Sequence, residues 1–86
     1  MATKQVIQKQ IESAVKGKYA DWRIGLADDP LVRKSQLGNP LHWIHWEAES
    51  PGDARQVFDH FNQRGMVNDG IQSDQAKFVY ITPLRS

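Results

Sequence analysis

The chain has 86 residues, no cysteine and a formal net charge of +1 at pH 7. A chain of this length buries only about 60% of the surface that its unfolded form exposes, so we expect one hydrophobic core and a single domain over residues 1–86. The composition excludes disulfides, thiol nucleophiles and cysteine-ligated metals, and because no run of about 20 apolar residues could span a bilayer, we expect a cytoplasmic protein without a membrane partner.

The first two elements follow from the spacing of apolar residues. A helix is predicted from about Lys4 to Lys16, because apolar side chains recur at the intervals of one helical face. These side chains are Ile7, Ile11, Ala14 and Val15. Next, Trp22, Ile24 and Leu26 alternate with an arginine and a glycine, which predicts a strand with one buried face.

A short helix and a second strand are expected to follow. Asp29 can cap a helix. Pro30 suits the first helical position, because the N–H that proline lacks would have no partner there. These signals predict a helix from about Pro30 to Leu37. The segment from Leu41 to Ala48 is rich in aromatic residues and too short for an ordinary helix, so we expect a strand.

The third helix is marked by its first residues. Ser50 and Asp53 have the spacing of a capping box, in which each side chain can bond the backbone N–H of the other residue. The apolar face of this helix contains Ala54, Val57, Phe58 and Phe61. Residues 66–76 are rich in Asn, Asp, Gly, Ser and Gln and are predicted to form a loop, and a last strand is expected from Phe78 to Ile81.

These elements alternate in the order α-β-α-β-α-β and predict an α+β fold. We expect a small two-layer sandwich in which three helices cover a three-stranded sheet. A sheet of three strands has two edges whose backbone groups can pair with another chain. A protein-interaction or homodimerisation module is therefore one functional alternative.

The histidines predict no metal site, and the tryptophans predict at most one surface anchor. His42 and His45 are separated by an odd number of positions on a strand, so their side chains point to opposite faces and would not share an ion. Trp43 and Trp46 are separated in the same way. We expect two of the three tryptophans to serve the core, and we select Trp22 as the candidate binding anchor.

Charge is unevenly distributed along the chain. Residues 1–40 contain seven Lys or Arg against four Asp or Glu, whereas residues 41–76 contain two against six. Such an asymmetry can steer a polyanion toward one side of a small domain.

One part of the chain, residues 21–61, resembles the middle of the GIY-YIG nuclease domain. The segment Arg23-Ile24-Gly25 is similar to the Tyr-Ile-Gly end of the second strand of that family, and Arg33 follows Gly25 by eight residues, where the catalytic arginine of the family lies. The helix that opens with Asp53-Ala54 is similar to the helix that carries the metal-binding glutamate. The resemblance implies a small α/β fold and a relationship to DNA-cleaving enzymes that use a tyrosine, an arginine, a glutamate and a divalent metal.

The sequence departs from this family at the positions that carry the chemistry. Arg23 replaces the tyrosine, and Phe58 stands roughly where the glutamate would lie, although Mg²⁺ requires oxygen ligands. Asp59 is rotated by about 100° around the helix from that position. The first strand of the family is missing, and we hypothesise that the strand containing Tyr80 takes its place in the sheet and brings Tyr80 beside Arg33.

The sequence therefore predicts a degenerate, non-catalytic GIY-YIG-like domain. Arg23, Arg33 and Lys34 are expected to contact a phosphate of nucleic acid or another acidic partner, with Trp22 as the anchor and without a cofactor or metal. A second alternative is a divergent, Mg²⁺-dependent DNA endonuclease. Its candidate catalytic residues would be Arg33, Tyr80 and Asp59.

Overall fold

The computed structural model describes residues 2–84, which form an α+β domain with three α-helices and a four-stranded sheet. The elements in chain order are α1 (Lys4–Val15), the 3₁₀ helix η1 (Tyr19–Asp21), β1 (Trp22–Ala27), α2 (Pro30–Gln36), β2 (Ile44–Glu47), α3 (Pro51–Gln63), β3 (Val67–Ile71) and β4 (Phe78–Pro83). The predicted helices and strands are confirmed to within a few residues at their ends. The prediction of a three-stranded sheet is wrong, because β3 lies in the segment 66–76 that was expected to be a loop.

The strands lie side by side in the order β2-β4-β1-β3. Central strand β1 pairs antiparallel with β4 and parallel with β3, while β2 pairs antiparallel with the other side of β4. The register places Gly25 of β1 opposite Tyr80 of β4. Strands that are neighbours in the sheet are thus distant in sequence, and the last strand lies at its centre.

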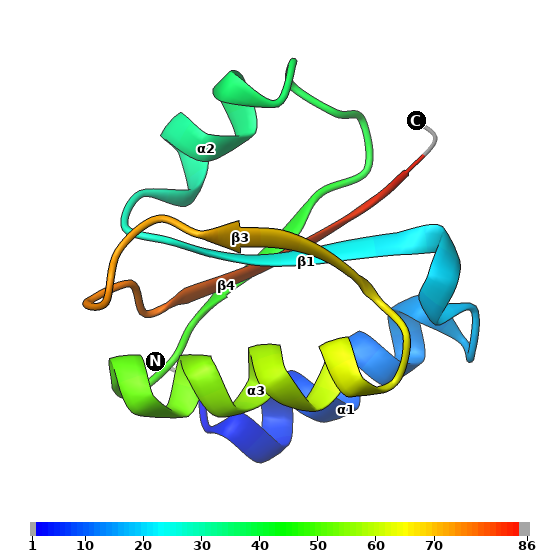
Figure 1. The fold of residues 1–86 in the computed structure, drawn as a ribbon, viewed down its shortest axis with the longest axis horizontal. Helices are drawn as coiled ribbons and strands as arrows, with labels where there is room; N and C mark the ends of the chain where they lie inside the picture. The colour runs from blue at the N-terminus through cyan, green and yellow to red at the C-terminus, as the bar shows by residue number, and fades with distance from the viewer. Residues whose placement is uncertain (1, 85–86) are drawn as a thin grey trace.

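Helices cover both faces of the sheet (Figure 1). Helices α1 and α3 lie against one face, and α2 crosses the other. The expected two-layer arrangement is therefore not confirmed. No helix within residues 2–84 has the length and apolar character needed to cross a membrane.

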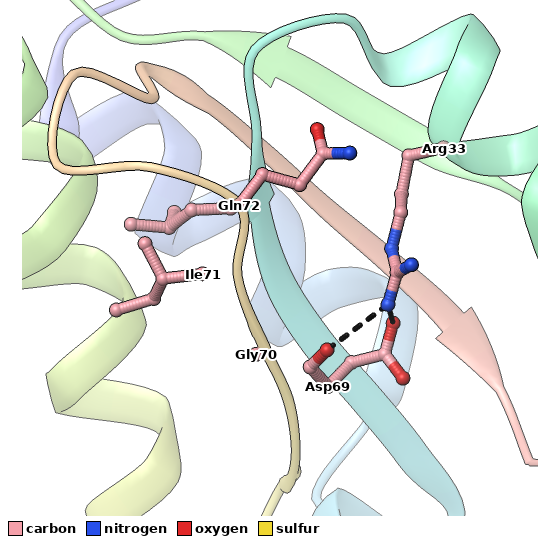
Figure 2. Close-up of a pocket in the computed structure, with 6 residues that line it drawn as sticks. Arg33, Asp69, Gly70, Ile71 and Gln72 are labelled. Carbon is pink, nitrogen blue, oxygen red and sulfur yellow. Dashed lines mark hydrogen bonds and ion pairs between the residues drawn. The ribbon is translucent and has the colours of Figure 1, made fainter.

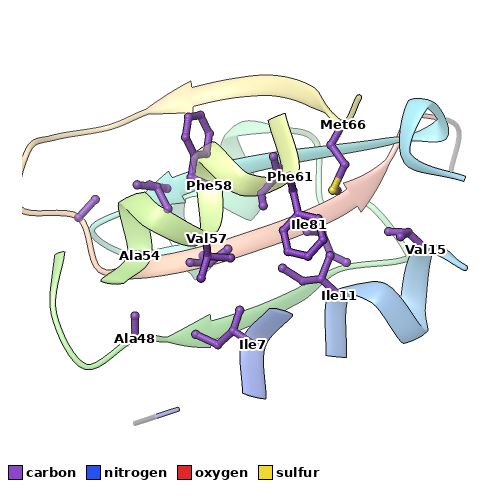
Figure 3. Packing of buried hydrophobic residues seen from close by; sticks show 14 residues of the cluster. Ile7, Ile11, Val15, Ala48, Ala54, Val57, Phe58, Phe61, Met66 and Ile81 are labelled. Carbon is purple, nitrogen blue, oxygen red and sulfur yellow. The ribbon is translucent and has the colours of Figure 1, made fainter. Parts of the chain in front are cut away.

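The main hydrophobic core lies between the sheet and the pair α1 and α3 (Figure 3). The largest of its fully buried side chains come from α1, β1, α3 and β4, and include Ile7, Ile11, Ile24, Leu26, Val57, Phe61, Val79 and Ile81. On β1 and β4 these residues alternate with Arg23, Gly25 and Tyr80, so the side chains of Arg23 and Tyr80 face α2. One set of strand positions builds the core, and the other builds the surface beneath α2.

Each α-helix begins at the residue type that the sequence signals favour. The side chain of Thr3 accepts a hydrogen bond from the backbone N–H of Val6 at 3.2 Å, and Asp29 accepts from two N–H groups in the first turn of α2. Ser50 accepts from the N–H of Asp53 at 3.1 Å. These bonds satisfy donors that have no partner within the helix. They confirm the predicted cap at Asp29 and the Ser50 side of the predicted capping box, whereas the cap at Thr3 was not predicted.

Strand β3 contains a β-bulge, and the bulge explains its unusual composition. Asp69 and Gly70 stand opposite the single residue Gly25, because the register moves from Ile24↔Asn68 to Leu26↔Ile71. Gly70 has φ of +96°, a conformation that glycine adopts without the steric cost of a Cβ atom. Because of the bulge, Asp69 faces α2 and Ile71 packs against the core, although residues two positions apart share one face of a regular strand.

Candidate anion-binding site

Tyr80 lies at the centre of the polar cluster beneath α2. Its side chain is fully buried and crosses the sheet over Gly25. A Cβ atom added to Gly25 would overlap the Tyr80 hydroxyl oxygen and the adjoining ring atoms. The indole ring of Trp43 stacks on the phenol ring, with centroids 4.6 Å apart and planes inclined by 12°. Glycine on one side and tryptophan on the other therefore fix the position of the hydroxyl.

Arg33 reaches from α2 to this hydroxyl and to β3. Its Nε donates to the Tyr80 hydroxyl at 3.1 Å, and its Nη2 donates to the backbone oxygen of Asp69 at 3.2 Å and to Oδ2 at 3.3 Å. Figure 2 shows the Arg33 guanidinium pointing toward Asp69. Its Nη1 donates to Gln36 Oε1 at 3.3 Å. The hypothesis that the last strand brings Tyr80 beside Arg33 is confirmed in this respect.

Asp69 joins the two arginines of the cluster. Arg23 on β1 approaches Oδ1 through Nη1 at 3.4 Å, while Arg33 and the Tyr80 hydroxyl both donate to Oδ2. The Nε of Arg23 is buried and has no hydrogen-bond partner among residues 2–84. Two guanidinium groups thus share one carboxylate, and the cluster carries a net charge of +1.

Burial and hydrogen bonding together determine the protonation of the cluster. Burial raises the pKa of Tyr80 to about 12, and the hydrogen bond to Asp69 acts in the same direction, whereas the hydrogen bond from Arg33 opposes them. The pKa of Arg33 is raised, chiefly by its bond to Tyr80. At neutral pH the phenol is therefore protonated and the guanidinium is charged, so Tyr80 acts as a hydrogen-bond donor and is a poor general base.

A surface pocket opens beside the Arg33 guanidinium (Figure 2). Its walls come from β1, α2, β3 and the residue that follows β3. The lining residues are Leu26, Arg33, Asp69, Gly70, Ile71 and Gln72. The side chains of Arg23 and Arg33 are 28% and 25% exposed, so a ligand can reach them although much of each side chain is shielded from water.

The remaining predicted site residues are distributed over both faces of the sheet. Lys34 follows Arg33 on α2 and is partly exposed. Trp22 occupies the opposite face of β1 from Arg23 and packs against the hydrophobic core. Asp59 lies on the exposed side of α3 and pairs with Arg55 at 3.4 Å. The structure therefore brings together Arg23, Arg33 and Tyr80 from the predicted set, but it separates Trp22 and Asp59 from them.

The two residues that the sequence analysis missed are Asp69 and Trp43. Asp69 was missed because it lies in a segment whose polar composition predicted a loop. Trp43 could have been recognised by its alternation with Trp46, since one of the pair had to face away from the core. Trp46 packs against the core, and the indole N–H of Trp43 donates to His45 Nδ1 at 2.9 Å.

The side chains of the cluster do not fit a magnesium ion. Within residues 2–84, no group of three or more His, Asp or Glu side chains is placed to hold a metal. Asp69 is the carboxylate closest to Arg33 and Tyr80, and its oxygens are already bonded to two guanidinium groups and a hydroxyl. A divalent cation there would face two positive charges, whereas Mg²⁺ needs an octahedral set of oxygen ligands.

Comparisons with known proteins identify no relative. No family model matches the chain, and neither a curated protein nor a solved structure matches it significantly.

Proposed function

We propose that this chain is a small, non-catalytic binding module whose cluster of Arg23, Arg33, Asp69 and Tyr80 holds a phosphate group of nucleic acid. One observation carries the proposal. Two guanidinium groups from different elements converge on a single carboxylate at a surface pocket and leave one positive charge in excess. Arginine is the residue best suited to hold phosphate oxygens, because its planar fork presents several donors at once.

Both guanidinium groups retain donors for a ligand. A guanidinium has five N–H groups, and within residues 2–84 Arg23 uses one side-chain bond, to Asp69. Both groups are held in place by the strand and the helix that carry them, so little further ordering is needed when an anion arrives. Attraction between partly buried charges is also stronger than attraction in bulk water.

The GIY-YIG resemblance supports nucleic acid as the source of the phosphate. Arg33 follows the strand segment Arg23-Ile24-Gly25, and the Tyr80 hydroxyl lies within hydrogen-bond distance of it. Binding without cleavage is supported by the position of Asp59. That carboxylate lies on α3, which covers the face of the sheet opposite α2 (Figure 1).

The test is a binding titration with fluorescein-labelled oligonucleotides, single-stranded and duplex, over a range of salt concentrations and with or without Mg²⁺. Arg33→Gln and Arg23→Gln are compared with Arg55→Gln, which removes the same charge from an exposed position on α3. We expect each cluster variant to weaken binding about tenfold and to reduce the slope of log K against log salt by nearly one for each phosphate that is no longer bound. Absence of binding at the lowest salt, or equally weakened binding in Arg55→Gln, would overturn the proposal.

A second candidate function is pairing with a protein or with another copy through the edge of β3. This strand is the last in the sheet order, and Val67 at its start is 41% exposed. Light scattering on the same samples tests it. A dimer that persists at high salt and dissociates in Val67→Lys would support an apolar edge contact, whereas a monomer at all concentrations would exclude it.

A further inference from the structure

Gln72 presents a hydrogen-bond donor to the pocket beside Arg33. The backbone N–H of Asp28 donates to Gln72 Oε1 at 3.0 Å. Because a backbone N–H can only donate, this bond fixes the orientation of the amide and leaves Nε2 as the free end. Figure 2 shows the amide nitrogen of Gln72 on the side of the pocket where Arg33 lies. The pocket therefore holds a neutral donor in addition to the charged one.

The segment that carries this donor is fixed to the rest of the fold. The backbone N–H of Gln72 donates to the Leu26 oxygen at 3.0 Å, and the Ser73 hydroxyl donates to Asp28 Oδ1 at 2.7 Å. Together with the bond from Asp28 to the Gln72 side chain, these bonds tie the chain after β3 to the end of β1 and the residue that follows it. A donor held in this way binds a ligand with little loss of conformational freedom.

The charge of the site indicates which anion it suits. Arg23 and Arg33 oppose Asp69, so the net charge is +1, and Gln72 adds a donor without adding charge. A phosphodiester carries one negative charge and two free oxygens, which matches one excess positive charge and two separate donors. A terminal phosphate carries nearly two charges at pH 7 and would remain partly uncompensated.

We propose that Gln72 is an anion-binding residue, which together with Arg33 holds the two free oxygens of one phosphodiester. This inference rests on the proposed function and specifies its ligand as an internal phosphate of a nucleic acid strand. In this arrangement Arg33 supplies the charge, and the Gln72 amide supplies the second hydrogen bond.

The experiment replaces Gln72 by two residues of similar length. Gln72→Glu keeps an acceptor for the Asp28 N–H but removes the donor and cancels the excess charge, while Gln72→Met removes the donor without changing the charge and also removes the acceptor of the Asp28 N–H. Gln63→Glu, at an exposed position at the end of α3, is the matched control. Binding is measured with a single-stranded oligonucleotide that lacks terminal phosphates, and separately with inorganic phosphate, a nucleoside 5′-monophosphate and acetate.

We expect Gln72→Met to weaken oligonucleotide binding about tenfold, as one hydrogen bond to a charged group predicts, without changing the salt slope. Gln72→Glu should weaken it further and reduce the slope, while its melting temperature stays close to that of the wild type because the Asp28 bond is kept. The oligonucleotide should bind more tightly than inorganic phosphate, the monophosphate or acetate.

The outcomes separate this inference from the proposed function. If both Gln72 variants bind like the wild type while Arg33→Gln binds weakly, the role of Gln72 is refuted and the proposed function stands. Tighter binding of the monophosphate or of acetate than of the oligonucleotide refutes the phosphodiester as ligand. If the wild type binds no oligonucleotide at low salt, the proposed function fails and the role of Gln72 fails with it.

Discussion

The two faces of the sheet are built on different physical principles, although they share the same strands. The face beneath α1 and α3 is closed by aliphatic and aromatic side chains, many of them completely buried. The face beneath α2 is closed by a hydrogen-bonded cluster and one aromatic stack, and two apolar residues of α2, Leu31 and Val32, remain 65% and 50% exposed. Burial of apolar surface stabilises the first face and needs no particular orientation of the groups. The second face depends on the geometry of its hydrogen bonds and on the charges of its side chains.

This difference shows how a small domain can separate stability from binding. Ile24 and Leu26 on β1 serve the core, while Arg23 and Gly25 between them serve the cluster. Substitutions on the core face should therefore affect the free energy of unfolding most strongly. Substitutions on the face beneath α2 should affect ligand affinity and pH dependence as well.

The largest effect is expected from Phe61→Ala. Phe61 is 0% exposed in the core, and truncating a buried phenylalanine costs about 3–5 kcal/mol of unfolding free energy. Leu31→Ala on α2 should cost no more than about 0.5 kcal/mol. Urea unfolding measures both values, and similar losses for the two variants would remove the distinction between the faces.

A smaller loss, about 2–3 kcal/mol, is expected for Gly25→Ala, because the new methyl group would collide with the Tyr80 ring. Gly52→Ala is the control, since its Cβ would meet only the Ser50 hydroxyl at 3.8 Å. In a Tyr80→Leu background the cost of Gly25→Ala should fall, because the colliding atoms are gone. Additive losses in this double-mutant cycle would show that the two positions are not coupled.

Alkaline pH should destabilise the protein through Tyr80. Its pKa is raised from 10.0 to about 12 in the folded state, so folding favours the protonated phenol. The resulting stabilisation is present below pH 10 and is lost as pH rises toward 12, and it amounts to about 2–3 kcal/mol. The difference in unfolding free energy between the wild type and Tyr80→Phe should shrink over this range. A difference that stays constant with pH would contradict the buried position of the hydroxyl.

The smallest loss of stability is expected for Asp69→Asn, and this variant should bind the oligonucleotide more tightly than the wild type does. Losing the carboxylate between two guanidinium groups should cost about 1 kcal/mol, since the pair is only partly buried. The net charge of the cluster would rise to +2, so oligonucleotide binding should become several times tighter and its salt dependence steeper. Asp59→Asn, on α3, is the control and should change neither. Weaker binding in Asp69→Asn would show that Asp69 positions the arginines for the ligand.

The sequence was sufficient for elements whose signals are local. The caps at Asp29 and Ser50 and the alternation along β1 involve neighbouring residues, and all three were predicted correctly. Strand β3 was missed because its bulge places Asp69 and Gly70 inside a strand, where a polar residue and a glycine normally indicate a turn. The order of the strands depends on pairing between distant segments, which local patterns do not encode.

The candidate site was predictable only where it resembled a known arrangement. The spacing of Arg33 after Gly25 indicated where the arginine would lie, and the need for a partner strand led to Tyr80. The carboxylate was sought on the third helix at Asp59, whereas Asp69 on β3 occupies the site. Trp22 shares the strand periodicity of Ile24, which already indicated that it would face the core.

The bulge in β3 allows the chain to change in length at one position without moving the site. Deleting Gly70 would leave Gly25 paired with Asp69 and Leu26 with Ile71, so the pairing with β1 would become regular and each of these residues would keep its face of the sheet. Ile71 would stay on the core side, and Gln72 would remain beside Asp28. Homologous sequences that keep this cluster should therefore tolerate a gap of one residue at Gly70, even where the residues around it vary.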